Sequence, residues 1–203
     1  MMLNEDFYLH DDVLFLAEKL IGKTLFTNIG GKLTAGIIVE TEAYKAPEDK
    51  ASHAYNLIRT KRNESMYRKG GTAYVYLCYG IHTMFNIVTN KEEMPHAILI
   101  RAIEPTLGIE VMLERRKKMN LTPSLTMGPG ALTQALGITL KQDKVPLFGP
   151  EIWIEKEKKI IPSDAIDKSK RIGIDYAEEY KEMLWRFTLK NSPYIRKEKR
   201  VKE

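Results

Sequence analysis

The residues best suited to chemistry lie between Ile37 and Asn86. This stretch holds the carboxylates Glu40 and Glu42, with Tyr44 two positions on, and then a lone histidine, a basic run and a tyrosine-rich segment. A carboxylate beside a sugar that develops positive charge can stabilise that charge and deprotonate an attacking water. Tyrosine rings offer flat surfaces on which an unstacked nucleobase can lie. The stretch therefore indicates chemistry at a nucleobase, with Glu42 as the candidate base.

The carboxylates belong to a predicted strand. Lys32–Tyr44 is rich in β-branched residues, and its alternation places both carboxylates and the tyrosine on one face. The next segment, Pro47–Arg68, has few periodic apolar residues and is predicted as a long connection, a common place for a binding loop. Residues 59–69 hold five Lys or Arg against one Glu, which favours contact with nucleic acid.

A predicted hairpin follows the basic run. Thr72–Tyr79 and His82–Thr89 flank a two-residue connection, the spacing of a tight hairpin. Tyr79 would lie at its tip, and Tyr74 and Tyr76 would share one face of its first strand. The tyrosines could equally form the half-buried face of an ordinary sheet.

The rest of the chain predicts helices and further strands. Asp11 or Asp12 can cap a helix that Gly22 ends. The other expected elements are a strand at 97–104, a helix at 106–119 whose basic end we interpret as structural, a short helix at 131–136 opened by Gly128-Pro129-Gly130, and a strand at 185–189. We expect an α+β fold: a single mixed domain with a curved, mainly antiparallel β-sheet, a protruding β-hairpin and surrounding helices.

The composition fits one globular domain. The 203 residues are 43% apolar and 29% charged, and the longest apolar runs are too short to span a membrane. With one cysteine and no secretory pattern at the N-terminus, the expected location is the cytoplasm, or the nucleoid in a prokaryote. Residues 186–203 hold seven Lys or Arg and two Glu, which accounts for the net charge of +5. We expect a folded domain at 1–195, a basic tail at 196–203 and a monomer.

A series of ordered blocks resembles one known family over nearly the whole chain. They include Val39-Glu40-Thr41-Glu42-Ala43-Tyr44, Pro47-Glu48-Asp49-Lys50-Ala51-Ser52-His53, Arg62-Asn63, Tyr74-Val75-Tyr76-Leu77-Cys78-Tyr79-Gly80, Phe85-Asn86-Ile87, Leu99-Ile100-Arg101-Ala102-Ile103-Glu104-Pro105, Gly128-Pro129-Gly130-Ala131-Leu132, Arg171-Ile172-Gly173 and Ser192-Pro193. The blocks resemble the alkyladenine (3-methyladenine) DNA glycosylases, single-domain enzymes that flip damaged purines out of duplex DNA. The resemblance implies a monofunctional base-excision enzyme that acts on damaged double-stranded DNA and leaves an abasic site. We expect it to need no cofactor.

The resemblance implies three residues for catalysis. Glu42 would activate the hydrolytic water, and Arg101 and the main-chain carbonyl of Ile172 would help to place that water. No residue is evident as an acid for the leaving base. We therefore expect positively charged alkylpurines, which leave readily, to be better substrates than neutral hypoxanthine.

It also implies a base pocket. Tyr44, His53 and Tyr76 would sandwich the flipped base, and Tyr74 would form a wall of the pocket. Asn86 would crowd the amino group of guanine and so disfavour that normal base.

The DNA contacts implied by the resemblance lie on the hairpin and the basic run. Tyr79 would fill the gap that the flipped nucleotide leaves in the duplex, with Ile81 beside it at the tip. Thr60, Arg62 and Asn63 would contact the DNA backbone.

Three other classes of protein need to be weighed. A metal enzyme would need ligands that converge, but the four histidines are scattered along the sequence and Cys78 is the single cysteine, so we expect no metal site. We expect Cys78 to be a buried small residue. A non-catalytic nucleic-acid binder would explain the tyrosines and the basic run, but not a carboxylate within the groove. A sugar hydrolase could use Glu40 and Glu42 as its acid pair, since alternate strand residues lie about 6.6 Å apart.

Overall fold

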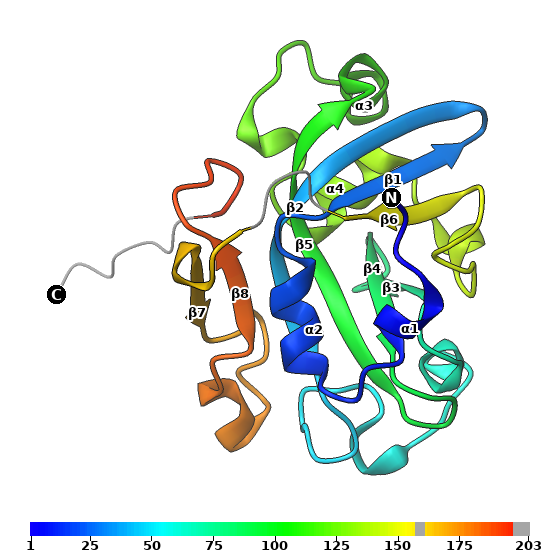
Figure 1. Ribbon diagram of the computed structural model, residues 1–203, viewed down its shortest axis with the longest axis vertical. Helices are drawn as coiled ribbons and strands as arrows, with labels where there is room; N and C mark the ends of the chain where they lie inside the picture. Colours follow the sequence, from blue (N-terminus) through cyan, green and yellow to red (C-terminus); the bar gives the residue numbers. More distant parts are fainter. Residues whose placement is uncertain (157–160, 197–203) are drawn as a thin grey trace, which may run out of the picture.

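The computed structural model describes residues 1–156 and 161–196 (Figure 1). Within these ranges the chain forms an eight-stranded antiparallel sheet with four α-helices, the α+β class expected from the sequence. The strands are β1 (Thr24–Ile29), β2 (Lys32–Tyr44), β3 (Ala73–Cys78), β4 (His82–Thr89), β5 (His96–Leu107), β6 (Ile152–Glu155), β7 (Ile166–Ser169) and β8 (Arg186–Leu189). The helices are α1 (Glu5–Tyr8), α2 (Val13–Leu20), α3 (Ile109–Arg116) and α4 (Pro129–Leu136).

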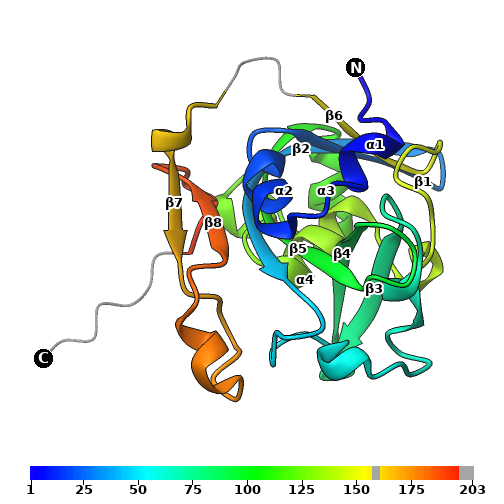
Figure 2. The ribbon, with the colours of Figure 1, turned by 60° about the horizontal axis from the view of Figure 1, so that its bottom comes forward.

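Strand β2 pairs with three other strands, β1, β5 and β8. The main strand order is β3-β4-β5-β2-β1-β6, and β8 pairs with both β2 and β7. Figures 1 and 2 show β7 and β8 together at one side of the main body. The pairing of β2 with β5 shifts register at Ala35/Gly36 and between Ile38 and Thr41. Such irregularities bend a strand, which lets β2 reach three neighbours.

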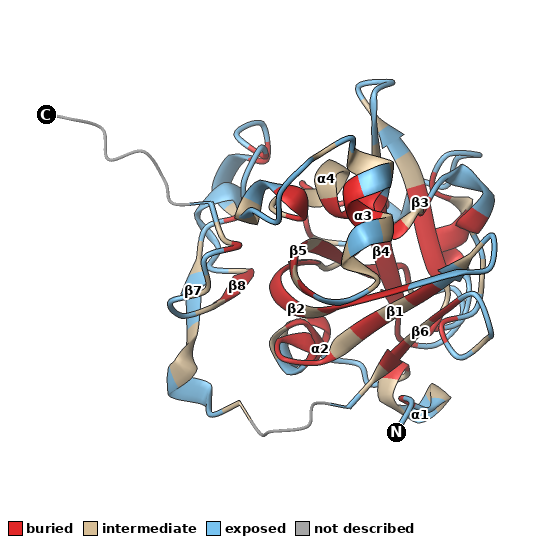
Figure 3. Ribbon diagram, turned by 90° about the horizontal axis from the view of Figure 1, so that it is seen from above, coloured by how far each residue is buried: buried red, intermediate tan, exposed pale blue. Residues whose placement is uncertain are grey.

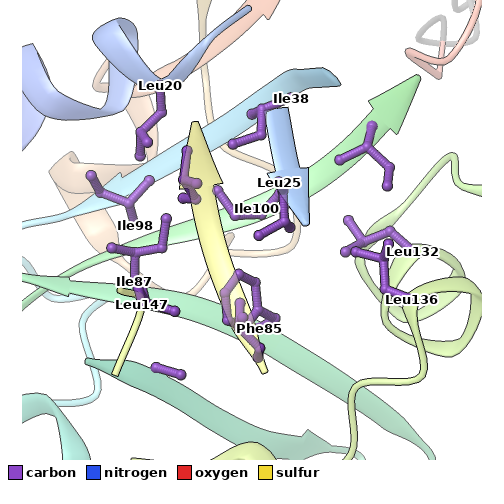
Figure 4. Packing of buried hydrophobic residues seen from close by; sticks show 14 of the residues in the cluster. Leu20, Leu25, Ile38, Phe85, Ile87, Ile98, Ile100, Leu132, Leu136 and Leu147 are labelled. Carbon is purple, nitrogen blue, oxygen red and sulfur yellow. The ribbon is translucent and has the colours of Figure 1, made fainter. Parts of the chain in front are cut away.

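The hydrophobic core lies on one face of the sheet. Ile98 and Ile100, alternate residues of β5, are fully buried in it. Figure 4 shows Leu20 of α2 and Leu132 of α4 around the side chains from the central strands. Leu99, which lies between Ile98 and Ile100 on β5, therefore faces the opposite side of the sheet.

Helix α2 forms as the sequence predicts. The Asp12 side chain accepts the Leu14 and Phe15 N–H groups at 2.9 and 3.1 Å, and Gly22 follows the helix at φ +87°. In residues 1–156 and 161–196 no helix is long and apolar enough to cross a membrane.

The hairpin turn differs from its prediction by one residue. Strand β3 ends at Cys78, and the Ile81 N–H donates to the Cys78 carbonyl at 3.1 Å. Tyr79 and Gly80 both have positive φ, 50° and 69°, as the two central residues of a type I′ turn do. Tyr79 is thus part of the turn, and Figure 3 shows this exposed turn projecting beyond the neighbouring elements.

The third helix begins later than expected. Strand β5 continues to Leu107, and Gly108 starts α3 at φ +69°. A Cβ at Gly108 would lie 2.3 Å from the Leu33 carbonyl oxygen, so the close approach to β2 requires glycine. The predicted tail, 196–203, lies outside the described residues apart from Arg196.

Candidate active site

Five strands contribute to one row of side chains. Across the sheet, Tyr74 of β3 pairs with Asn86 of β4, Asn86 with Leu99 of β5, Leu99 with Glu42 of β2, and Glu42 with Arg186 of β8. Direct partners in an antiparallel sheet point to the same side, so this row lies on the face opposite the core. Residues up to 144 positions apart in sequence (42 and 186) thereby share one surface.

The carboxylate of Glu42 is fully buried and accepts hydrogen bonds on both oxygens. The Ile172 N–H donates to Oε1 at 2.8 Å. The Tyr44 hydroxyl and Arg101 Nη1 donate to Oε2 at 2.9 and 3.2 Å. Donors of this kind fix the orientation of the carboxylate. Ile172 contacts Glu42 through its N–H, and the part of its carbonyl in placing the water, implied by the resemblance, stays a prediction.

Glu40 anchors the arginine that holds Glu42. Its Oε1 accepts from Arg101 Nε at 2.9 Å and from Arg186 Nε at 2.7 Å. Burial acts to lower the pKa of Arg101, but Glu42 and Glu40 outweigh it, so the pKa is raised and the guanidinium stays charged. Both guanidinium groups therefore bind the same oxygen of this carboxylate. This arrangement argues against Glu40 as the acid of a sugar hydrolase.

A pocket of about 590 Å³ opens beside this network. Arg101 and Ile172 line it, while Glu42 lies behind them with no exposed surface. The pocket brings together the side chains that the sequence placed around a base: Tyr44, His53, Tyr74, Tyr76 and Asn86. Cys78, expected to be buried, is half-buried and also lines it.

One wall of the pocket is an aromatic cluster. His53 Nδ1 and the Tyr74 hydroxyl are hydrogen-bonded at 2.7 Å. Tyr76 stacks on Tyr74 with ring centroids 5.2 Å apart, and His53 meets Tyr76 edge-on at 4.7 Å. Burial, with a smaller effect of the Arg62 charge, lowers the pKa of His53 to about 4. Burial raises the pKa of both tyrosines, so this wall is uncharged at neutral pH.

Tyr44 lines the pocket on the side opposite the aromatic cluster. Its hydroxyl contacts Glu42, and the Arg171 guanidinium carbon lies 4.8 Å from its ring centroid. Burial, and next the Glu42 charge, raise the pKa of Tyr44 well above its usual value. Because Arg171 is buried and does not line the pocket, we infer that the other face of the ring is the one that faces the cavity.

Asn86 lies between the two sides. It is buried, and its Nδ2 donates to the Tyr74 carbonyl at 3.2 Å. The hydrogen bond therefore fixes the orientation of the Asn86 amide in the pocket lining.

Of the five residues expected to contact DNA, four are exposed and one is buried. Tyr79 and Ile81 are 89% and 75% exposed, and Thr60 and Arg62 are exposed as well. Asn63 is only 1% exposed. Its amide donates to two backbone carbonyls and its oxygen accepts from Thr60, so its polar atoms are engaged within the loop. This geometry makes Asn63 a residue that shapes the loop.

The charge of the basic run is partly neutralised. Arg59 donates to Glu64 and to Glu93, each at 2.7 Å at closest, and Lys69 Nζ lies 2.8 Å from Glu5. Arg62 lies with its guanidinium carbon 5.1 Å from the Tyr76 ring centroid, at the pocket rim. Counting charges along the sequence therefore overstates the positive field of this loop.

The basic end of α3 is structural, as interpreted from the sequence. Arg115 donates to the carbonyls of Ala135 and Ile29, and Arg116 donates to Gln134 and to the Leu125 carbonyl.

Sequence reasoning missed several residues of the site. Arg171 pairs with Asp49, Arg186 pairs with Glu40, and Tyr176, which is 67% exposed, lines the pocket mouth. The paired residues are 122 and 146 positions apart, so no local pattern could have joined them. Within the described ranges, no three His, Cys, Asp or Glu side chains lie close enough together to hold a metal ion.

Comparison with known proteins identifies the family. A family model described as methylpurine-DNA glycosylase matches residues 6–193. The chain is 51% identical over 201 residues to a protein of Chlamydia felis, which covers 98% of this chain and 100% of that protein. It is 45% identical over 202 residues to a protein of Clostridium acetobutylicum, with 96% and 97% covered, and 44% identical over 194 residues to one of Bacillus cytotoxicus, with 92% and 95% covered. The names of all three give 3-methyladenine DNA glycosylase as a provisional function. The chain therefore belongs, as its motifs indicate, to the methylpurine-DNA glycosylase family.

Proposed function

We propose that this protein is a monofunctional DNA glycosylase that flips alkylated purines out of duplex DNA and hydrolyses the N-glycosidic bond with a water activated by Glu42. The product would be an abasic site. The observation that carries the proposal is the Glu42 carboxylate, buried and held by three donors directly behind an aromatic pocket. A fixed carboxylate both stabilises positive charge on the sugar and accepts a proton from water.

The aromatic geometry suggests where the base lies. His53 and Tyr76 touch each other edge-on, which leaves no room for a base between those two rings. The base would instead lie between Tyr44 on one side and the adjoining rings of His53 and Tyr76 on the other. A positively charged alkylpurine would gain extra attraction from electron-rich tyrosine faces. Asn86 in the pocket lining would crowd the amino group of guanine.

The hairpin turn is suited to fill the gap in the duplex. An aromatic ring as exposed as Tyr79 has no role in the core, and the turn conformation directs it away from the sheet. Tyr176, also exposed at the pocket mouth, would stack near it on a neighbouring nucleotide. Arg62 would leave the Tyr76 ring and turn outward to a phosphate, and Thr60 would bind the backbone beside it.

The direct test is excision of purines from methylated duplex DNA without added metal or nucleotide. Free base and alkali-labile abasic sites are measured for the native protein and for Glu42→Gln. We expect release by the native protein and a loss of about 10³-fold in Glu42→Gln, because the amide cannot accept the proton of the water.

Glu104→Gln is the matched control. Glu104 lies on β5 near Arg101 in sequence but outside the pocket lining, so its variant should release base at the native rate. Tight binding to methylated DNA with no release by any of the proteins would favour a non-catalytic nucleic-acid binder. Neither binding nor release would refute the proposed substrate.

A further inference from the structure

A buried ion pair lies beside the site, outside the residues assigned above. Arg171 Nη1 donates to Asp49 Oδ2 at 2.6 Å, and Nη2 donates to Oδ1 at 2.9 Å. Neither side chain has exposed surface. A two-pronged pair of this kind fixes the relative orientation of two planar groups, and removing one partner leaves a buried charge uncompensated.

Arg171 joins three parts of the chain through one guanidinium group. The Asp49 pair ties it to the loop that follows β2. Its other contacts are the carbonyls of Ala43 on β2 at 2.9 Å and Tyr180 at 3.2 Å, and the ring centroids of Tyr44 at 4.8 Å and Trp185 at 4.9 Å. Strand β2, the loop after it and the segment after Arg171 are thus held in one arrangement.

Each partner of the pair connects to one half of the site. The amide that follows Arg171 is that of Ile172, which donates to Glu42 Oε1. Asp49 also accepts the N–H groups of Lys45 and Ala51 at 3.2 and 3.0 Å, and so shapes the loop that carries His53. The ion pair therefore links the amide that binds Glu42 to the loop that carries His53.

We propose that Arg171 and Asp49 are a positioning pair that fixes the catalytic carboxylate relative to the base pocket. Arg171 holds the Ile172 amide against Glu42 and covers the outer face of Tyr44, while Asp49 sets the loop that leads to His53. Neither residue lines the pocket, so each acts through its neighbours. This inference rests on the proposed glycosylase function.

The test compares Arg171→Lys, Asp49→Asn and the double variant with the native protein. Two quantities are measured: the single-turnover rate of base release from methylated duplex DNA, and the affinity for a duplex that contains a reduced abasic site. We expect the release rate to fall about 10- to 100-fold, because small displacements of a catalytic group cost that much. Affinity should stay within about threefold, because phosphate contacts dominate it. The double variant should be no slower than the slower single variant, since the two residues act as a unit.

Two control variants separate positioning from stability. Lys50→Met removes an exposed ion pair with Glu178 and Glu179 that joins the same two loops, and should release base at the native rate. Arg115→Met removes a structural arginine bonded to the carbonyls of Ile29 and Ala135, away from the pocket. It should lower the melting temperature but leave the release rate unchanged below it.

The possible results distinguish a failure of the positioning role from a failure of the proposed glycosylase function. Native release rates in both Arg171→Lys and Asp49→Asn would overturn the inference, and so would an equal slowing in Arg115→Met at matched stability. If Arg171→Lys fails to fold by circular dichroism, the rate of the isosteric Asp49→Asn decides alone. If the native protein releases no base, the proposed function itself fails and the positioning role falls with it.

Discussion

The buried network of Glu40, Glu42, Arg101 and Arg186 behind the pocket, called the floor below, differs from the exposed rim in burial and in charge. At the floor, Glu42 has no exposed surface, and its oxygens are bound by groups from β2, β5 and the Ile172 segment. At the rim, Tyr79 and Ile81 project from a turn between β3 and β4, where their side chains meet water.

Under the proposed function, the buried region suits the reaction and the exposed rim suits contact with DNA. A charge that must act on a transition state gains from a fixed, dry environment, and that environment is provided by the Arg186–Glu40–Arg101–Glu42 series. A residue that must enter DNA has to remain exposed until DNA arrives. Changes at the floor should therefore alter reaction rate and stability together, whereas changes at the rim should alter binding alone.

After Glu42→Gln, the largest effect is expected for Arg101→Met, which removes one cation from the network around Glu42. Glu40 and Glu42 each lose a cation that donates a hydrogen bond. We expect single-turnover release to fall about 100-fold and the free energy of unfolding to fall by about 3 kcal/mol. Urea denaturation and rapid-quench kinetics measure the two quantities. Lower stability together with a native release rate would mean that Arg101 stabilises the fold and has no part in the reaction.

The second effect concerns the choice of lesion. The aromatic wall holds no cationic acid at neutral pH, since the pKa of His53 lies at about 4. Burial raises the pKa of the Tyr74 and Tyr76 hydroxyls, which makes them weaker proton donors. A neutral base needs a proton to leave, whereas 3-methyladenine in DNA already carries positive charge. We expect release of 3-methyladenine to be about 10- to 100-fold faster than release of hypoxanthine from matched duplexes. Faster release of hypoxanthine would reveal an acid in the pocket.

A third effect tests the burial of His53 through stability. The pKa of His53 is about 4 in the folded protein and near 6.5 when unfolded, so between these values the unfolded chain binds more protons. The free energy of unfolding should therefore fall as the pH drops, by about 1.5 kcal/mol from this residue between pH 6.5 and 5. Urea unfolding at both pH values measures it.

His53→Gln should reduce this pH dependence. Equal pH dependence in the native protein and His53→Gln would show that the aromatic wall is open to water.

The smallest effect is expected on the basic loop. Arg62→Ala should weaken DNA binding about threefold and lower the slope of log affinity against log salt by about one. Arg59→Ala should leave the slope unchanged, because Glu64 and Glu93 already hold that guanidinium. Binding titrations at several salt concentrations compare the two. The reverse order would mean that the Arg59 ion pairs open on DNA.

Local patterns made much of the fold predictable. Strand β2 follows from the alternation in Lys32–Tyr44, the start of α2 from Asp12, and α4 from its glycine and proline signals. The connection between β3 and β4 starts one residue earlier than predicted, because Tyr79 takes a positive φ and β3 ends at Cys78, opposite His82.

The site was predictable only in part, for a related reason. Motifs that resemble the family pointed to Glu42, Tyr44 and Arg101, each within or beside a recognisable strand. The ion pairs of Asp49 with Arg171 and of Glu40 with Arg186 depend on the path of the chain in space, and charged residues in a sequence do not reveal their partners.

The division between floor and rim is tested most directly by setting Glu42→Gln beside Tyr79→Ala in the same two assays. These assays are single-turnover release of 3-methyladenine at saturating protein and affinity for a duplex with a reduced abasic site. We expect Glu42→Gln to lose about 10³-fold in release with affinity within about threefold, and Tyr79→Ala to lose about tenfold in affinity with a much smaller loss of release. Native release by Glu42→Gln at saturating protein would rule out Glu42 as the catalytic base.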